Sequence, residues 1–122
     1  MAKIFLDTNY FIDAIHRRPE KLILGTLEGH TVYISTLSIH IYYYVYNIKI
    51  PNVKVTEQRE KFQVVDFSEI ILDRSLVGPT ADFEDNVQLH SAAESGCDFF
   101  LTSDNKLLSM KFFGKTKIVS AL

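Results

Sequence analysis

The sequence has one cysteine, no excess of basic residues and no long apolar run, and each shortage excludes a class of protein. Cys97 is the only cysteine among 122 residues, which excludes an internal disulfide framework and fits a reducing compartment. No stretch approaches the roughly 18 apolar residues that span a bilayer. The N-terminus, MAKIFLDTN, has no apolar signal segment. We therefore expect a cytoplasmic protein that does not use a membrane.

Charge and ligand types narrow the range of functions further. The chain carries 13 basic against 15 acidic side chains, a net charge of −2. Strong contacts to phosphates need Lys and Arg, so any nucleic-acid role must depend on a local patch or on metal ions. No Cys/His cluster at zinc spacing is present, which argues against zinc. The length predicts a single domain over residues 1–122.

Short apolar runs alternate with helical patterns along the chain. No tight hairpin signal such as Asn-Gly separates two of the runs. Alternation of this kind predicts an α/β fold of three layers, with a five-stranded parallel sheet covered by helices on both faces. The five predicted strands are residues 3–7, 30–35, 62–67, 97–104 and 116–121.

The stretch TADFEDNVQLHSAAESG, residues 80–96, predicts a helix with a face of small apolar residues. Continued towards its N-terminus, that face meets Asp85 and then Asp82. A carboxylate that faces inward needs a partner or a metal. Alternatively, Asp82 caps the helix and Asp85 only complements the helix dipole. The pattern places Leu89, Ala92, Ala93 and Gly96 on the inner face and Glu84, Ser91 and Ser95 on the solvated face.

Other aspartates are predicted at the same place in the sheet. Asp7 ends the first strand, Asp104 follows the fourth, and the helix that carries Asp85 leads into the fourth. If strands one and four are neighbours, these carboxylates meet beyond the carboxyl ends of the strands. Two such charges about 4 Å apart cost about 4 kcal/mol at an effective dielectric near 20. Either their pKa values rise or a divalent cation binds, and all-oxygen ligands suit Mg²⁺ or Mn²⁺. Taken singly, Asp7 is more typical of a helix cap, and Asp104 of a turn or cap, than of catalysis.

Four segments in this order resemble the PIN-domain family, and above all the small ribonuclease toxins of type II toxin–antitoxin pairs. The segments are FLDTNYFID, STLSIHIYYYV, ADFEDNVQLHSAAESGCDFFLTSD and NKLL. The resemblance implies a PIN-like five-stranded parallel sheet and hydrolysis of RNA phosphodiester bonds with Mg²⁺ or Mn²⁺. By position, it implies Asp7, Asp85 and Asp104 as catalytic metal ligands, Asp82 as an additional ligand, and Asn9, Thr102 and Ser103 as residues that orient the site and bind substrate.

One position departs from the family pattern. The family places Glu in the helix after the second strand, where this chain has Ile41. An isoleucine cannot bind a metal ion, and the adjacent His40 points about 100° away around the helix. The departure predicts a weakened ribonuclease, with the second metal position more affected than the first. The alternative is an inactive PIN-like module that binds RNA or a protein partner.

Two further segments suggest binding surfaces. The run YYYVY, residues 42–46, cannot face the core with all its tyrosines, and we favour a homodimer or antitoxin contact over base stacking for the exposed ones. The segment HRRPEK, residues 16–21, and Lys106 could contact phosphate. For residues 16–21, a plain solvated face is the favoured interpretation.

Overall fold

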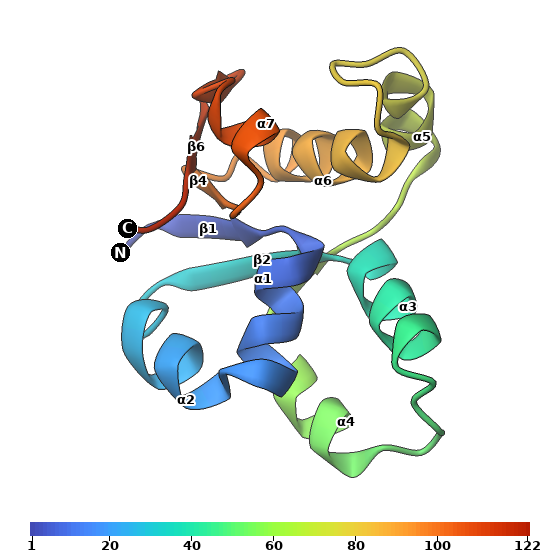
Figure 1. The fold of residues 1–122 in the computed structure, drawn as a ribbon, viewed down its shortest axis with the longest axis vertical. Coiled ribbons are helices and arrows are strands. Elements are labelled where there is room, and N and C mark those ends of the chain that lie inside the picture. The colour runs from blue at the N-terminus through green and yellow to red at the C-terminus, as the bar shows by residue number, and fades with distance from the viewer.

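A computed structural model describes the backbone of residues 1–122 and every side chain except those of residues 23 and 24 (Figure 1). One six-stranded sheet has the order β3-β2-β1-β4-β6-β5, and all neighbours are parallel except β5 and β6. The predicted three-layer α/β fold is thus confirmed. The strands are β1 (Lys3–Leu6), β2 (Thr31–Ser35), β3 (Gln63–Val65), β4 (Phe99–Leu101), β5 (Phe112–Phe113) and β6 (Thr116–Val119).

Strand β5 was not predicted from the sequence. It has two residues and pairs antiparallel with β6 at the edge of the sheet. The turn between them contains Gly114, whose φ of 61° lies in the left-handed region that favours glycine. A two-residue strand is too short to give an alternating pattern, which is why the sheet has six strands where five were expected.

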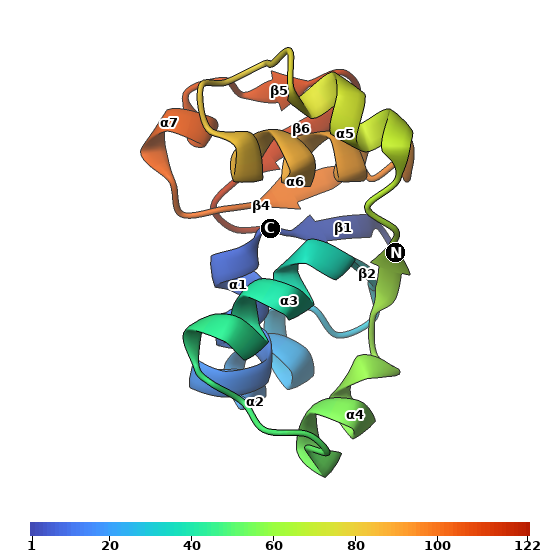
Figure 2. The ribbon, with the colours of Figure 1, turned by 90° about the vertical axis from the view of Figure 1, so that its right-hand side faces the viewer.

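Helices cover both faces of the sheet (Figures 1 and 2). Helices α1 to α4 lie on one side, and α5 and α6 lie on the other. Wider π-helical turns extend α1 over Asp13–Arg17 and α2 over Leu22–Thr26. The helices are α1 (Thr8–Ile12), α2 (Pro19–Lys21), α3 (Thr36–Val45), α4 (Val53–Arg59), α5 (Glu69–Ser75), α6 (Phe83–Glu94) and α7 (Asn105–Leu108).

Strand β1 supplies both hydrophobic cores, because successive residues of a strand point to opposite faces. Ile4 and Leu6 belong to the core beneath α1 and α3, and Phe5 belongs to the core beneath α6. The ring of Phe5 stacks on that of Phe100 in β4, with ring centroids 5.6 Å apart. A strand buried on both faces reads as a continuous apolar run, which is what KIFL shows. Among the described residues, no helix is long and apolar enough to cross a membrane.

Helix α6 is more completely buried than its sequence pattern predicted. It packs against both the sheet and α5, so Gln88 and Ser91 are buried, although Ser91 was expected in solvent. The Ser91 hydroxyl donates to the Val87 carbonyl at 2.6 Å, within the same helix, and therefore needs no other partner. Ala93 and Gly96, expected on the inner face, are exposed. The prediction was wrong for Ser91, Ala93 and Gly96. It assumed that α6 packs against the sheet alone, whereas α6 also packs against α5.

Candidate functional site

Three of the four predicted aspartates are helix N-caps in the structure. Asp7 caps α1, Asp82 caps α6 and Asp104 caps α7. Each uses one carboxylate oxygen for the cap, so its other oxygen is available to a ligand. Capping and metal binding are therefore compatible interpretations of these residues. The backbone amides that donate to the three carboxylates belong to Tyr10, Asp85 and Lys106, at 2.8, 3.0 and 2.8 Å respectively.

Strands β1 and β4 are neighbours, which brings Asp7 and Asp104 to the same edge of the sheet. The Asp7 amide donates to the Leu101 carbonyl at 3.1 Å. Thr102 lies between the two aspartates and has no exposed surface. Its hydroxyl accepts the Asp104 amide at 3.0 Å, and it lies beside the Asp7 carboxylate, whose pKa it lowers. The condition for the predicted cluster, adjacent first and fourth strands, is therefore met.

Helix α6 brings its N-terminal carboxylates to the same edge. Burial raises the pKa of Asp85 to about 6, and the charges of Asp82, Asp104, Glu84 and Asp7 add to the rise. The pKa of Asp7 is also raised, chiefly by burial and to a smaller extent by the charge of Asp104. Carboxylates from β1, α6 and β4 thus repel one another across a shared space, as unpaired like charges do.

Glu84 belongs to this cluster, although its sequence pattern placed it on the solvated face. Its side chain is half-buried and lies near the Thr8 hydroxyl, which lowers its pKa. Burial is the main cause of its raised pKa, followed by the charge of Asp82, and Asp7 contributes as well. A signal was available: Glu84 stands four residues before Gln88, a second polar side chain on the same face of the helix.

The residues at the position of the missing family glutamate do not contribute a carboxylate. Ile41 is half-buried on α3. His40 is exposed, and its ring stacks on that of Tyr44 with centroids 6.4 Å apart. His40 therefore does not replace the missing side chain, as predicted.

The residues predicted to orient the site have different surroundings. Thr102 is fully buried beside Asp7, so its side chain does not reach a substrate. Asn9 and Ser103 are exposed, and the Ser103 side chain lies near that of Tyr10. Both exposed residues are accessible to a substrate at the edge of the sheet.

Two open cavities flank the aspartates, and each has basic side chains in its wall. One, of about 330 Å³, lies at the start of α6 and α7. The other, of about 320 Å³, lies beside α1 and α2. Lysine and arginine thus border an acidic centre on two sides. The first cavity includes Asp82, Asp85, Asp104 and Lys106 in its wall, and the second includes Tyr10, Arg18, Lys21 and Ser103.

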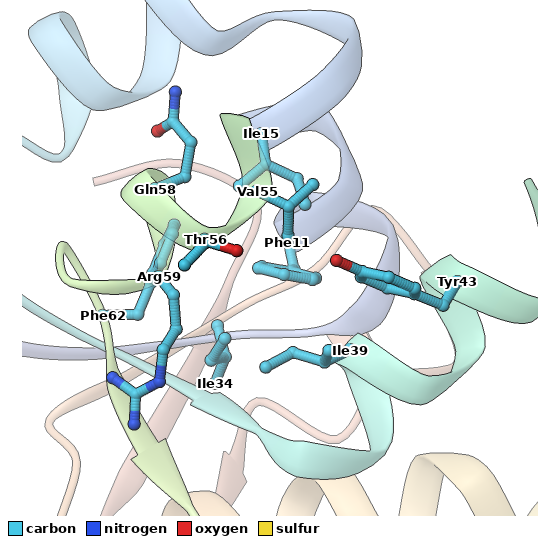
Figure 3. A pocket seen from close by; sticks show the side chains of 10 residues that line it. All are labelled: Phe11, Ile15, Ile34, Ile39, Tyr43, Val55, Thr56, Gln58, Arg59 and Phe62. Carbon is cyan, nitrogen blue, oxygen red and sulfur yellow. The ribbon is translucent and has the colours of Figure 1, made fainter. Parts of the chain in front are cut away.

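A third cavity, of about 230 Å³, lies between α1, β2, α3 and α4 and is lined mainly by apolar side chains (Figure 3). Phe11, Ile34, Ile39 and Tyr43 converge on it, while the guanidinium of Arg59 points away. It lacks the carboxylates of the edge cluster, so the chemistry of the site does not take place there.

The donor atoms of the edge cluster suit a hard cation. Among the residues whose side chains are described, no three acidic, His or Cys side chains are grouped closely enough to hold a metal ion as they stand. Without a cation between them, carboxylates repel one another and stay apart. Three of these carboxylates also accept N-cap hydrogen bonds from backbone amides, which fixes their positions. The donors are all carboxylate oxygens, which match the preference of Mg²⁺ and Mn²⁺.

Comparisons with known proteins identify the family and agree with the fold. The family model of the PIN domain matches residues 3–106, and the chain belongs to the PIN-domain family. A crystal structure of VapBC2 from Rickettsia felis bound to a DNA fragment from its promoter has the same fold, with a TM-score of 0.66. The two chains are 17% identical over 96% of this chain and 97% of the other. No curated protein matches the sequence.

Proposed function

We propose that this PIN-domain protein is a metal-dependent endoribonuclease and the toxin of a toxin–antitoxin pair. The observation that carries the proposal is the convergence of Asp7, Asp85 and Asp104, from three separate elements, on one edge of the sheet. PIN-domain proteins are typically nucleases, and the chain belongs to that family. The structural neighbour supports the fold only, because its sequence identity of 17% is too low to support a shared function.

The chain's own residues have defined roles in this proposal. Asp7, Asp85 and Asp104 would hold Mg²⁺ or Mn²⁺, with Asp82 as an additional ligand. When bound, the ion supplies positive charge at the scissile phosphate and lowers the pKa of an attacking water. The buried Thr102 hydroxyl keeps the Asp7 carboxylate oriented towards the site. None of these residues needs to act as a covalent nucleophile.

Basic residues on both sides of the cluster support RNA as the substrate. Lys106 borders one cavity, and Arg18 and Lys21 border the other. These basic side chains share the cavity walls with four aspartates, so RNA binding would also depend on the charge of a bound ion. RNA would cross the edge of the sheet, with Asn9 and Ser103 exposed along its path.

Exposed apolar side chains support a partner chain. Tyr44, Val45, Ile50 and Val53 are 65% to 84% exposed around the end of α3 and the start of α4. Tyrosine and aliphatic side chains of this kind are enriched at interfaces. We propose that an antitoxin or a second copy of the chain covers them, because the structural neighbour is a VapBC2 complex. Light scattering of the chain alone would detect the homodimer.

Ile41 favours a second candidate, an inactive PIN-like module that binds RNA or a protein without cleaving it. One RNA cleavage assay distinguishes the ribonuclease from the inactive binding module. A labelled RNA is incubated with Mg²⁺ or Mn²⁺ and with the native chain, Ile41→Glu, Asp85→Asn or Asp73→Asn. We expect slow cleavage by the native chain, faster cleavage by Ile41→Glu, and a loss of at least about 100-fold in Asp85→Asn.

Asp73→Asn is the matched control, because Asp73 is an exposed helical aspartate on α5 outside the cluster. It should cleave RNA as the native chain does. If neither the native chain nor Ile41→Glu cleaves any RNA with either metal ion, the ribonuclease assignment is wrong and the binding module is correct.

A further inference from the structure

The two cavities that flank the acidic edge differ in charge. The cavity at the start of α6 and α7 has three aspartates and one lysine in its wall. The cavity beside α1 and α2, here called the α1–α2 cavity, has one acidic residue, Asp13, against two basic residues, Arg18 and Lys21. A polyanion that crosses the edge therefore meets a favourable charge in the α1–α2 cavity and an unfavourable one on the other side.

The single carboxylate of the α1–α2 cavity is already paired. The guanidinium of Arg17 lies 2.6 Å from the carboxylate of Asp13 and also donates to the Asn9 carbonyl at 3.0 Å. Arg18 and Lys21 are exposed, and neither forms an ion pair with any side chain that the structure describes. The wall of the cavity thus offers two uncommitted positive charges and no uncommitted negative charge.

The backbone holds these two basic residues one turn apart. The Arg18 amide donates to the Asp13 carbonyl at 2.6 Å, which closes the π-helical turn, and Arg18 then leaves the helical conformation with φ of −141° and ψ of 49°. Pro19, whose ring fixes φ, begins α2, and Lys21 ends it. Both side chains line the same cavity, so together they can hold one phosphate group.

Tyr10 supplies an aromatic wall to the α1–α2 cavity. Its half-buried side chain packs against the core beneath α1 on one side. Its backbone amide donates to the Asp7 carboxylate at 2.8 Å, and its hydroxyl donates to the Ser120 carbonyl. The ring is therefore fixed before any ligand binds, directly beside the acidic edge. A rigid aromatic face of this kind can stack on a nucleobase at a low cost in conformational entropy.

A positive wall combined with an aromatic face is the arrangement that binds single-stranded nucleic acid. An acidic peptide would use the two charges but not the ring, and a base that remains paired in a duplex cannot stack on a side chain. We propose that the α1–α2 cavity binds the unpaired nucleotide next to the scissile phosphate, with the base stacked on Tyr10 and the phosphate held by Arg18 and Lys21. The inference rests on the proposed ribonuclease function and gives it a preference for single-stranded RNA.

The test is fluorescence anisotropy of the full chain with a labelled single-stranded RNA of mixed sequence, in EDTA, over a series of salt concentrations. EDTA prevents metal-dependent cleavage, so the experiment measures RNA binding alone. Arg18→Gln combined with Lys21→Gln should lower the affinity at low salt at least about tenfold. It should also reduce the slope of log affinity against log salt by about 1.4, because each contact to a single-strand phosphate contributes about 0.7.

The matched control removes the same charges from another surface. Lys54 and Arg59 are exposed residues of α4 outside the α1–α2 cavity. Lys54→Gln combined with Arg59→Gln should leave the affinity and the salt slope close to those of the native chain. Equal losses in the two double variants would show that only net charge matters, and the inference would be wrong.

A second set of variants tests the stacking. Tyr10→Leu keeps an apolar side chain against the core but removes the ring, so the affinity should fall at least about fivefold while the salt slope stays unchanged. Tyr10→Phe retains the ring and should recover most of that loss. With a duplex of the same sequence, Tyr10→Leu should have no effect. If Tyr10→Leu is poorly folded by circular dichroism, Tyr10→Met replaces it. Native affinity of the folded variant for single-stranded RNA would refute the stacking.

The outcomes separate this inference from the proposed function. If the native chain binds RNA and the Arg18 and Lys21 double variant binds it equally well, the cavity is not the subsite, while cleavage by the native chain would still support the ribonuclease. If the double variant binds weakly but neither the native chain nor Ile41→Glu cleaves RNA, the cavity is an RNA site and only the ribonuclease assignment fails. If the native chain binds no RNA even at low salt, the inference is overturned.

Discussion

The buried hydroxyl of Thr102 lies beside the carboxylate of Asp7, across the junction of β4 and β1, and lowers the pKa of that carboxylate. The same hydroxyl accepts the amide of Asp104. One side chain therefore links the two aspartates that come from opposite ends of the sequence. We therefore expect Thr102 to fix the positions of both aspartates. Substituting it tests whether Mn²⁺ affinity depends on this arrangement or only on the stability of the fold.

Thr102→Val should weaken Mn²⁺ binding and lower stability. The substitution keeps the shape of the side chain but leaves the Asp104 amide without its partner and removes the hydroxyl beside the Asp7 carboxylate. We expect a loss of about 1–2 kcal/mol in the free energy of unfolding. Urea denaturation measures the stability, and calorimetry measures the Mn²⁺ affinity.

Thr116→Val is the control for this experiment. Thr116 is also buried, and its hydroxyl donates to the Cys97 carbonyl at 2.8 Å, away from the carboxylates. It should lose a similar amount of stability without any change in Mn²⁺ affinity. Equal effects of both substitutions on Mn²⁺ binding would show that Thr102 acts only through stability.

Asp85→Asn should stabilise the metal-free protein at neutral pH. The pKa of Asp85 is about 6 in the folded chain against 3.8 in the reference state, so the folded state binds more protons between these values. Stability of the native chain therefore falls as the pH rises from 3.8 to about 6, and the asparagine variant escapes this loss. Above pH 6 we expect a gain of about 1 kcal/mol after allowance for solvent screening.

The measurement is urea unfolding of both chains in a chelating buffer over a series of pH values. The difference between the two chains should vanish below the reference pKa of 3.8, where Asp85 is protonated in both states. A variant less stable than the native chain at pH 7 would contradict the prediction and show that the Asp85 charge makes favourable contacts.

Mn²⁺ affinity should depend on pH in the opposite sense to stability. Below the Asp85 pKa of about 6 the ion must displace a proton, so affinity falls by about tenfold for each pH unit. Above that value the carboxylate is ionised and the affinity should level off. Titrations between pH 5 and pH 8 measure the profile, and a flat profile would exclude Asp85 as a ligand.

Much of the fold was predictable because its local signals agree with its global structure. KIFL is a buried strand, Ser68 caps α5 through its hydroxyl, and the alternation of strands and helices gives a parallel sheet. Strand β5 was not predictable, because two residues carry no periodicity. The inner face of α6 was misjudged because a sequence does not show how many neighbours a helix has.

Only part of the candidate site could be predicted from the sequence. The spacing of residues along the chain shows where an element ends, but it does not show which side chains of other elements lie beside it. Asp7 and Asp104 could be placed at one edge because the carboxyl ends of parallel strands meet there. Glu84 could not, because its neighbour Thr8 belongs to another helix and is 76 positions earlier in the sequence. The basic residues beside the cluster likewise become neighbours only after folding.

The central position of β1 determines when this surface can exist. Strand β1 lies between β2 and β4, so its edge towards β4 stays unpaired until the much later residues Phe99–Leu101 have been synthesised. Until residue 104 has emerged, Asp7 has no acidic neighbour from β4 and no Thr102 to hold it. We therefore expect no catalysis at the carboxyl edge of the sheet before β4 has paired with β1. Translation products that end before β4 would be inactive.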